Sequence, residues 1–321
     1  MIIKKIVPDS HSKSNGSSAP YDSVFDTPQW TGLFGEKTTH YGLYDASGAL
    51  TGRFYIYRER RYGLSVCCNP PLTPTIGPFF RNDAQNPVRA MDKCKLIMSH
   101  IAEYIDKMNY SVVSLSFDKS IIDMQPFIWR DFKVVPQYTY VMELALPVDD
   151  IWRRMSYEKR NHITRGVKDG LAVRQINDYS VVKALVLKTF SRQKKTISES
   201  GMNKVLFDFA NDANSFAFAA FHHGNPIACS FCVRDNKTAY YLLGGYDSEN
   251  KHHAAGPLCV WESIRHAKSL GLPHFDFEGS MVPAIEQYFR GFGGRLTPYY
   301  RVNKAKLPLE IALKFFKRGL F

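Results

Sequence analysis

The pattern of apolar and polar residues along this chain has the period of a strand in some segments and the period of a helix in others. A strand pattern followed by a helix pattern occurs twice. Residues 48–58 and residues 224–234 each show the alternation of a strand after a glycine turn, and each ends in an arginine. Residues 91–108 and residues 257–270 carry apolar residues every three or four positions, which predicts a helix with one buried face. A strand followed by a long helix is therefore expected in both halves of the chain.

The segments that follow each long helix also correspond in order and type. Each helix precedes an apolar strand, then a short helix that begins at a proline, then a β-rich run. These predicted elements lie at residues 110–118, 126–133 and 138–144 in the first half and at residues 272–278, 283–290 and 297–302 in the second half. Internal duplication accounts for the shared order better than chance does. The expected fold class is α/β with mixed sheets (α+β), in two tandem domains.

Length and pattern agree on two domains. A chain of 321 residues suits two cores of roughly 150 residues each. We place the border after residue 147, so that the domains cover residues 1–147 and 148–304. The last helix, residues 305–321, is assigned to the first domain.

Two further helices are predicted at the ends of the second domain. Asp149 or Asp150 is expected to cap the first of them, residues 151–167. Residues 307–318 have the pattern of an amphipathic helix. Packing against the first domain is the favoured interpretation of this last helix, and docking on a membrane surface is the alternative.

Composition indicates a folded protein of the cytoplasm. A hydrophobic content of 45% argues against disorder. No apolar run approaches the ~20 residues of a membrane-spanning helix, and the amino end lacks the apolar stretch of a secretory signal.

Cysteine and histidine spacings predict neither a disulfide framework nor a metal site. Cys229 and Cys232 are spaced as C-x-x-C, but they fall on opposite faces of a predicted strand. Reduced cysteines of a core are the expected interpretation of both. The histidines show no ligand spacing such as His-Glu-x-x-His.

Positive charge is concentrated in one segment. The net charge is +12, and residues 151–205 contain thirteen Lys and Arg against four Asp and Glu, which is +9 by subtraction. Such a field favours an anionic partner such as a phosphate, a nucleotide, RNA or anionic lipid. For any one of these residues, a solvated helix face is the alternative.

Four segments, in this order, resemble the FemABX family, the paired-domain relatives of the GNAT acyltransferases. They are residues 152–170, residues 240–247, residues 275–279 and residues 288–293. Arg290 departs from the family signature, which has a lysine there, so a planar guanidinium replaces a point charge. Residues 252–257 also depart, because simple GNAT enzymes carry a glycine-rich loop for the pyrophosphate of CoA at that place.

The resemblance implies N-acyl transfer between paired GNAT-like domains. An acyl or aminoacyl group would move from acyl-CoA or aminoacyl-tRNA to an amino group of a bacterial cell-envelope precursor, an amino sugar or a lipid. The phosphate-bearing carrier is a co-substrate, and no cofactor is bound permanently. The acceptor is expected to be linked to a nucleotide or a lipid, and peripheral contact with the inner face of a membrane is a further expectation. A non-catalytic module that binds RNA or anionic lipid is the alternative.

Residues 275–294 bring acids, glycines and a cation into one short segment. Asp276 and Glu278 lie two apart on the predicted strand, so their carboxylates are expected on one face. We expect Glu278 to contact the acceptor amine, and Asp276 to pair with Arg290 or Arg295 and hold the turn. Arg290 is expected to neutralise an oxyanion or a donor phosphate, with a surface ion pair as the alternative.

The same resemblance implies residues that bind the donor or the acceptor. Arg58 and Tyr62, on a basic hairpin of the first domain, would hold phosphates of the acceptor. Arg165 belongs to the basic segment, and the helix that includes Gly256 could hold a phosphate at its amino end. The other implied residues follow the family motifs of the second domain: Tyr240, Gly244, Asp276, Gly279, Ser280 and Phe289.

Overall fold

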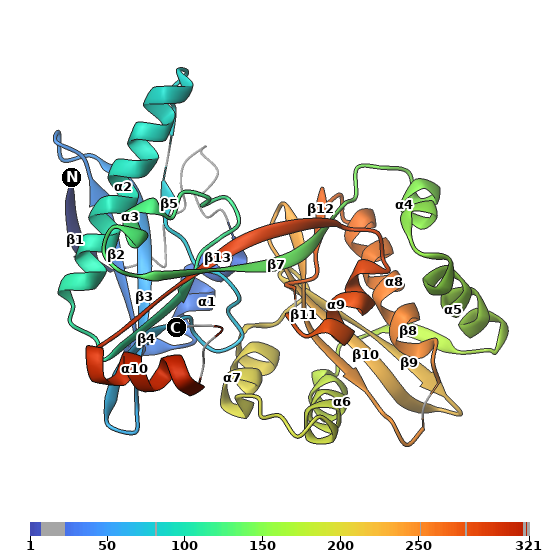
Figure 1. Cartoon of the computed structure of the whole chain (residues 1–321). Helices are drawn as coiled ribbons and strands as arrows, with labels where there is room; N and C mark the ends of the chain where they lie inside the picture. The colour runs from blue at the N-terminus through green and yellow to red at the C-terminus, as the bar shows by residue number, and fades with distance from the viewer. Residues whose placement is uncertain (8–22, 81, 251, 280, 317–318, 320–321) are drawn as a thin grey trace. The chain divides into compact units, whose positions relative to one another are not determined.

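The computed structural model describes residues 1–7, 23–80, 82–250, 252–279, 281–316 and 319 (Figure 1). The chain forms two compact units. Unit 1 comprises Met1–Gln137 and Pro298–Phe321, and unit 2 comprises Tyr138–Thr297. Each unit contains a mixed sheet with helices packed on it, which confirms the expected α/β fold class.

The sheet of unit 1 contains antiparallel neighbours and one parallel pair. Strands β1 to β4 pair antiparallel, β4 and β6 pair parallel, and β6 and β13 pair antiparallel. Along the sheet they are β1 (Ile2–Ile6), β2 (Thr38–Tyr44), β3 (Leu50–Arg61), β4 (Leu64–Cys68), β6 (Val112–Ser116) and β13 (Arg295–Ala305), with β5 (Phe79–Phe80) beside β3. The helices are α1 (Pro28–Gly32), α2 (Pro87–Lys107), α3 (Gln125–Ile128) and α10 (Leu307–Phe316).

Unit 2 repeats this plan with further helices. Strands β8 to β11 pair antiparallel, β11 and β12 pair parallel, and β12 and β7 pair antiparallel. The strands are β8 (Ala172–Ile176), β9 (Ser215–His222), β10 (Asn225–Arg234), β11 (Thr238–Tyr246), β12 (His274–Asp276) and β7 (Lys133–Glu143). The helices are α4 (Val148–Arg154), α5 (Tyr157–Lys168), α6 (Tyr179–Arg192), α7 (Glu199–Asn203), α8 (Ala255–Ser269) and α9 (Pro283–Arg290).

Both units show the predicted order of elements, which confirms the internal duplication. In each unit three antiparallel strands lead into a long helix, α2 or α8, and then into a strand parallel to the third. The last strand of each copy is exchanged: β7 follows α3 in the chain but pairs with β12, and β13 follows α9 but pairs with β6. The units therefore divide at Gln137 and Thr297, whereas the sequence suggested borders at residues 147 and 304.

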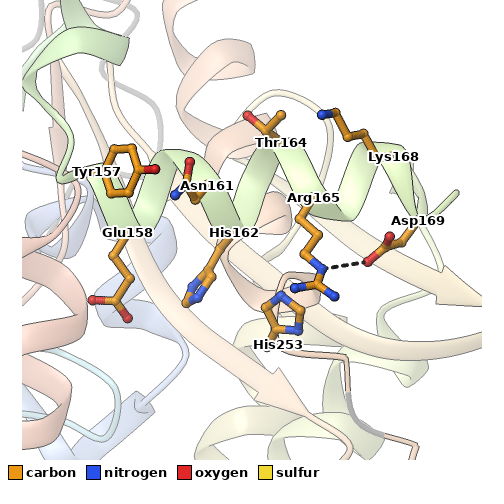
Figure 2. Close-up of a pocket in the computed structure, with 9 residues that line it drawn as sticks. All are labelled: Tyr157, Glu158, Asn161, His162, Thr164, Arg165, Lys168, Asp169 and His253. Atoms are coloured by element: carbon orange, nitrogen blue, oxygen red, sulfur yellow. Dashed lines mark ion pairs between the residues drawn. The ribbon is translucent and has the colours of Figure 1, made fainter.

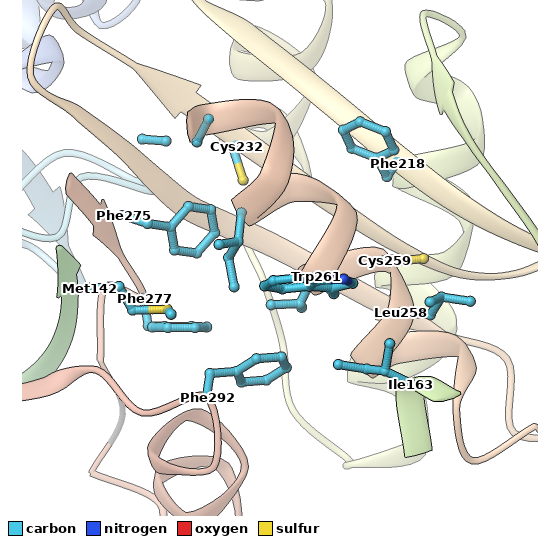
Figure 3. Packing of buried hydrophobic residues seen from close by; sticks show 14 of the residues in the cluster. Met142, Ile163, Phe218, Cys232, Leu258, Cys259, Trp261, Phe275, Phe277 and Phe292 are labelled. Atoms are coloured by element: carbon cyan, nitrogen blue, oxygen red, sulfur yellow. The ribbon is translucent and has the colours of Figure 1, made fainter. Parts of the chain in front are cut away.

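Helix α8 covers one face of the unit 2 sheet because its apolar residues recur at helical spacing. Leu258, Trp261 and Ile264 of α8 lie in one core cluster with Phe218 of β9 and Cys232 of β10 (Figure 3). Burying a large apolar side chain of this kind stabilises a fold by about 1.5–3 kcal/mol. The face of the unit 2 sheet beneath α8 is therefore filled with tightly packed core side chains.

Helix α6 covers the opposite face of the same sheet. Tyr179 of α6 packs edge-on against Phe231 of β10 at 5.3 Å between ring centroids, whereas Ser230, the preceding residue, lies 2.7 Å from Ser263 of α8. This alternation also separates Cys229 from Cys232, and both thiols are buried and free, as predicted.

Three predicted elements differ clearly from the observed ones. The helix expected at residues 126–133 is the four-residue α3, Gln125–Ile128. The helix expected at residues 151–167 is two helices, because Met155 has extended backbone (ψ 151°) and Ser156 then caps α5 through the amide of Lys159 at 3.2 Å. Asp149 and Asp150 lie in the first turn of α4 and do not cap it. The strand expected at residues 272–278 contains only His274–Asp276.

The chain leaves β12 through a left-handed turn. Glu278 and Gly279 have φ values of 58° and 71°, and the amide of Glu278 donates to Asp276 Oδ1 at 2.9 Å. A Cβ at position 279 would lie 2.0 Å from the carbonyl oxygen of Tyr138. Glu278 therefore lies beyond the strand, and the expectation that strand alternation places it on one face with Asp276 is wrong.

Replacing Gly279 by alanine tests the close approach at this turn. The added Cβ meets Tyr138 in a left-handed backbone, so Gly279→Ala is expected to lower the free energy of unfolding by about 3 kcal/mol. Gly271→Ala is the matched control, because Gly271 has φ 75° and open space around its Cβ position, and it should cost about 1 kcal/mol. Urea denaturation measures both variants, and equal losses would show that the steric contact does not determine the turn.

Candidate functional site

The centre of the candidate site lies where β11 and β12 part. Their parallel pairing joins Thr238–Tyr240 with His274–Asp276, after which β12 ends and β11 continues to Tyr246. Tyr241, Phe277 and Phe289 lie between the diverging segments, with ring centroids 5.1–6.2 Å apart. Aromatic side chains from β11, from the β12 exit and from α9 therefore pack in the core where the two strands separate.

Asp276 ends β12 and holds the exit turn. Its side chain is buried, and Oδ1 accepts hydrogen bonds from the Thr139 hydroxyl at 2.6 Å and from the Glu278 amide at 2.9 Å. This geometry agrees with a turn-holding role, with Thr139 of β7 as one partner. Glu278 follows in left-handed backbone, which a non-glycine residue seldom adopts and which occurs often at functional sites.

Arg290 ends α9 with an exposed side chain. Its Nε lies 3.1 Å from Glu286 Oε1, one helical turn earlier, and 62% of the side chain is accessible. Glu286 also accepts a hydrogen bond of 2.5 Å from the Tyr140 hydroxyl. Burial, and then this hydrogen bond, raise the pKa of Tyr140. An ion pair this exposed contributes about 0–1 kcal/mol, so an incoming anion can compete with Glu286 for the guanidinium.

A pocket lined by both basic and acidic side chains lies along α5 (Figure 2). Its volume is about 640 Å³, and its lining residues are Tyr157, Glu158, Asn161, His162, Thr164, Arg165, Lys168, Asp169 and His253. Asp169 Oδ2 lies 3.5 Å from Nε of Arg165, which also lines the pocket, and 3.2 Å from Nε2 of His252 beside it. The expected candidate Arg165 therefore lines a pocket together with Lys168 and a histidine from another segment.

Imidazole rings continue from this pocket to the β9–β10 turn. His253 lies 5.0 Å from His162 and 4.9 Å from His252, and His222 lies 6.0 Å from His252 and 4.1 Å from His223, between ring centroids. Burial and the neighbouring His252, His162 and Arg165 lower the pKa of His253. The ring is therefore largely neutral at neutral pH, and an anion bound beside it would favour its protonation.

Helix α8 begins beside these histidines. Its N-cap residue, Ala254, provides no side-chain cap. The Ala255 amide donates to the His252 carbonyl at 3.0 Å, and Pro257 has no amide hydrogen, so the Gly256 amide is the first-turn donor that suits an anion. Gly256 lies in that turn, and a Cβ there would be 3.3 Å from the Tyr288 hydroxyl. The predicted phosphate-binding residues Gly256 and Arg165 thus belong to neighbouring elements of unit 2.

Lys159, a buried cation on α5, is not among the residues predicted from the sequence. Its side chain is on the inner face of the helix, with Nζ 3.9 Å from the ring centroid of Tyr288 and 4.8 Å from that of Phe292. Burial lowers the pKa of Lys159 to about 8. The spacing of Met155, Lys159 and Ile163 on one apolar face was the signal in the sequence that could have found it.

Three other predicted residues make contacts that support the fold of unit 2. The Tyr240 hydroxyl donates to Asp235 Oδ2 at 2.9 Å, and Phe289 is part of the core. A Cβ at Gly244 would lie 1.9 Å from the Tyr241 hydroxyl, so only glycine permits the observed position of that ring. Ser280 lies outside the described residues.

In unit 1, Arg58 and Tyr62 belong to the β3–β4 hairpin. Arg58 is exposed on β3, opposite Cys67 of β4. Tyr62 and Gly63 form the turn with φ values of 51° and 78°, and the Tyr62 side chain is fully exposed. Both side chains are therefore open to a ligand of unit 1.

A family model matches part of unit 2. Residues 197–290 match the acetyltransferase (GNAT) domain, and this segment contains strands β9 to β12 with helices α8 and α9. The sequence matches none of the curated proteins with which it was compared. The family match supports transferase chemistry for the segment in which β11 and β12 separate.

Solved structures of the same fold extend over nearly the whole chain. FemX is similar with a TM-score of 0.67 and 12% identity, over 98% of this chain and 100% of that chain. L-PGS from Bacillus licheniformis is similar with a TM-score of 0.53 and 11% identity, over 90% and 91%. The C-terminal domain of a putative lysylphosphatidylglycerol synthetase from Agrobacterium fabrum gives 0.55 and 10%, over 85% and 87%. With the family match, this shared fold confirms the resemblance to FemABX-like acyltransferases of the GNAT superfamily.

Two structural observations bear on other kinds of site. Within the described ranges, no three histidine, cysteine or carboxylate side chains converge as ligands for a metal ion. In the same part of the chain, no helix combines the length and the apolar character that crossing a bilayer requires.

Lys159→Met tests the buried cation. The folded pKa of Lys159, about 8, lies below the usual value near 10.4, so between these values the unfolded chain holds a proton that the folded chain does not. The free energy of unfolding of the wild type should therefore rise relative to that of Lys159→Met by about 2 kcal/mol between about pH 7 and about pH 10. Urea denaturation at both pH values measures this difference. Lys168→Met, at an exposed position of the same helix, is the control, and the difference in free energy of unfolding between it and the wild type should stay the same at the two pH values.

Proposed function

We propose that the chain is an N-acyltransferase that moves an acyl or aminoacyl group from a phosphate-bearing carrier to an amino group. The observation that carries the proposal is the parting of β11 and β12, after Tyr240 and Asp276, inside the segment that matches the GNAT domain. Glu278 precedes α9, the helix that follows the separation of β11 and β12, and Arg290 is the last residue of that helix. We assign the reacting contacts to these two side chains.

In the proposed reaction, the acceptor nitrogen attacks the carbonyl carbon of the donor. A C–N bond forms while the carbonyl oxygen becomes an oxyanion, and the bond to the carrier's sulfur or oxygen then breaks. Glu278 orients the amine, whose proton passes to the carboxylate or to water, and the leaving group takes a proton from solvent. Arg290 neutralises the oxyanion or a donor phosphate, which its exposure and its weak pairing with Glu286 support.

The pocket along α5 is the proposed site for the donor's phosphates. Arg165 and Lys168 supply cations, His253 supplies a ring that can become charged, and the amino end of α8 follows directly. Acyl-CoA and aminoacyl-tRNA both carry phosphates that such a pocket could hold. In unit 1, Arg58 and Tyr62 are the proposed contacts for a nucleotide- or lipid-linked acceptor.

The test of the function offers the purified chain several donors in parallel. Acetyl-CoA, a long-chain acyl-CoA and an aminoacyl-tRNA are each incubated with glucosamine, with a nucleotide-linked muropeptide that bears an amine, and with phosphatidylethanolamine. Mass spectrometry should find an acceptor heavier by the acyl group of one donor class. Tight RNA or lipid binding without any acylated product would instead favour a non-catalytic module.

Arg290→Ala tests the assigned cation once a donor is found. Removal of one group that stabilises an oxyanion lowers kcat by about 10²-fold or more, and Arg290→Lys should recover part of the rate because it keeps the charge. Arg265→Ala is the control: Arg265 lies on α8 with 54% exposure and pairs with Glu262 at 3.0 Å, much as Arg290 pairs with Glu286. Equal rates for Arg290→Ala and the wild type would remove Arg290 from the mechanism.

Arg165→Gln tests the pocket. We expect binding of the donor to weaken about tenfold, with a shallower dependence on salt, because one phosphate contact is lost. Arg153→Gln is the matched control, since Arg153 on α4 is similarly exposed, 71% against 69%, and also pairs with an aspartate of its own helix. Fluorescence anisotropy with labelled CoA and labelled tRNA measures both variants, and equal weakening would indicate only the general positive field.

A further inference from the structure

Helix α10 of unit 1 exposes a row of large apolar side chains. Leu307, Ile311 and Phe315 are 74%, 53% and 81% exposed, and their spacing of four residues puts them on one side of the helix. We call these three residues the outer stripe. Phe316, which is 84% exposed, extends the apolar surface around the end of the helix.

The opposite side of α10 is less exposed. Leu309 and Leu313 are only partly exposed, and no residue of the helix is fully buried. The packing expected from the sequence therefore involves at most this inner side. An amphipathic helix that packs on a core normally has a polar outer side, so apolar residues on both sides indicate a second surface that α10 covers.

The charges around α10 identify the chemistry of that second surface. Residues 306–318 contain four Lys and Arg and one Glu, and that Glu310 pairs with Lys314 at 2.8 Å. Lys314 lies three residues after Ile311 and therefore flanks the outer stripe. A second copy of this chain would bring like charges together, whereas an anionic surface complements them.

The length of α10 determines whether the helix could span a bilayer or would lie along its surface. Its ten residues extend about 15 Å, half of the ~30 Å hydrocarbon thickness of a bilayer. We propose that α10 lies in the plane of an anionic lipid bilayer, with the outer stripe among the acyl chains and Lys314 at the headgroups. This proposal rests on α10 alone and does not depend on the reaction proposed for unit 2.

Vesicle flotation of the full chain tests the proposal. The wild type should float with vesicles of equal parts phosphatidylcholine and phosphatidylglycerol, much less with phosphatidylcholine alone, and less as salt rises. The double variant Ile311→Ser with Phe315→Ser should partition at least about tenfold more weakly, because it removes two of the three apolar side chains of the outer stripe. Lys314→Gln should weaken partitioning about fivefold, and circular dichroism checks that each variant is folded.

The double variant Ile128→Ser with Trp129→Ser is the matched control. These residues of unit 1 are 53% and 63% exposed and lie at and after the end of α3, so their loss should leave flotation unchanged. Three outcomes overturn the proposal: no flotation of the wild type with anionic vesicles, equal loss in the control, or loss of a dimer in sedimentation experiments instead of loss of vesicle binding. The last outcome would assign the outer stripe to a second copy of the chain.

Discussion

The early end of the β11–β12 pairing is the constraint on which the candidate site depends. Parallel neighbours in a buried sheet normally continue side by side, but these two share only three residue pairs. Asp276 stops β12 by accepting bonds from Thr139 and from the Glu278 amide, which turns the backbone into left-handed geometry. This turn sets the direction in which the chain continues to α9 and Arg290.

The exchange of β7 and β13 completes both sheets. Without β7, the edge of β12 that carries Asp276 would lack its antiparallel neighbour, and without β13 the same would hold for β6 in unit 1. Unpaired strand edges are unstable and prone to aggregate. Each sequence half therefore needs a strand from the other half, which ties the site of unit 2 to residues that precede it in the chain, such as Thr139 and Tyr140.

The electrostatic field around α5 depends on which of its basic side chains point to solvent and which point to the core. Arg165 and Lys168 are exposed and line the pocket beside the acidic Glu158 and Asp169. Lys159, on the inner side of the same helix, lies against two aromatic rings, and burial shifts its pKa downward. A charge count over residues 151–205 treats these residues alike, although only the outward ones contribute to the field that a ligand meets.

The sequence by itself determined the order of elements, the duplication, the bounds of α9 at residues 283–290 and the basic character of the α5 segment. These features are local, because helical and strand periods and charge runs are set within about ten residues of chain. Only the tertiary structure decided the strand exchange, the break between α4 and α5 at Met155, the left-handed turn at Glu278 and the burial of Lys159. Each of these depends on contacts between segments far apart in sequence, whose pairing energies no local pattern of residues contains.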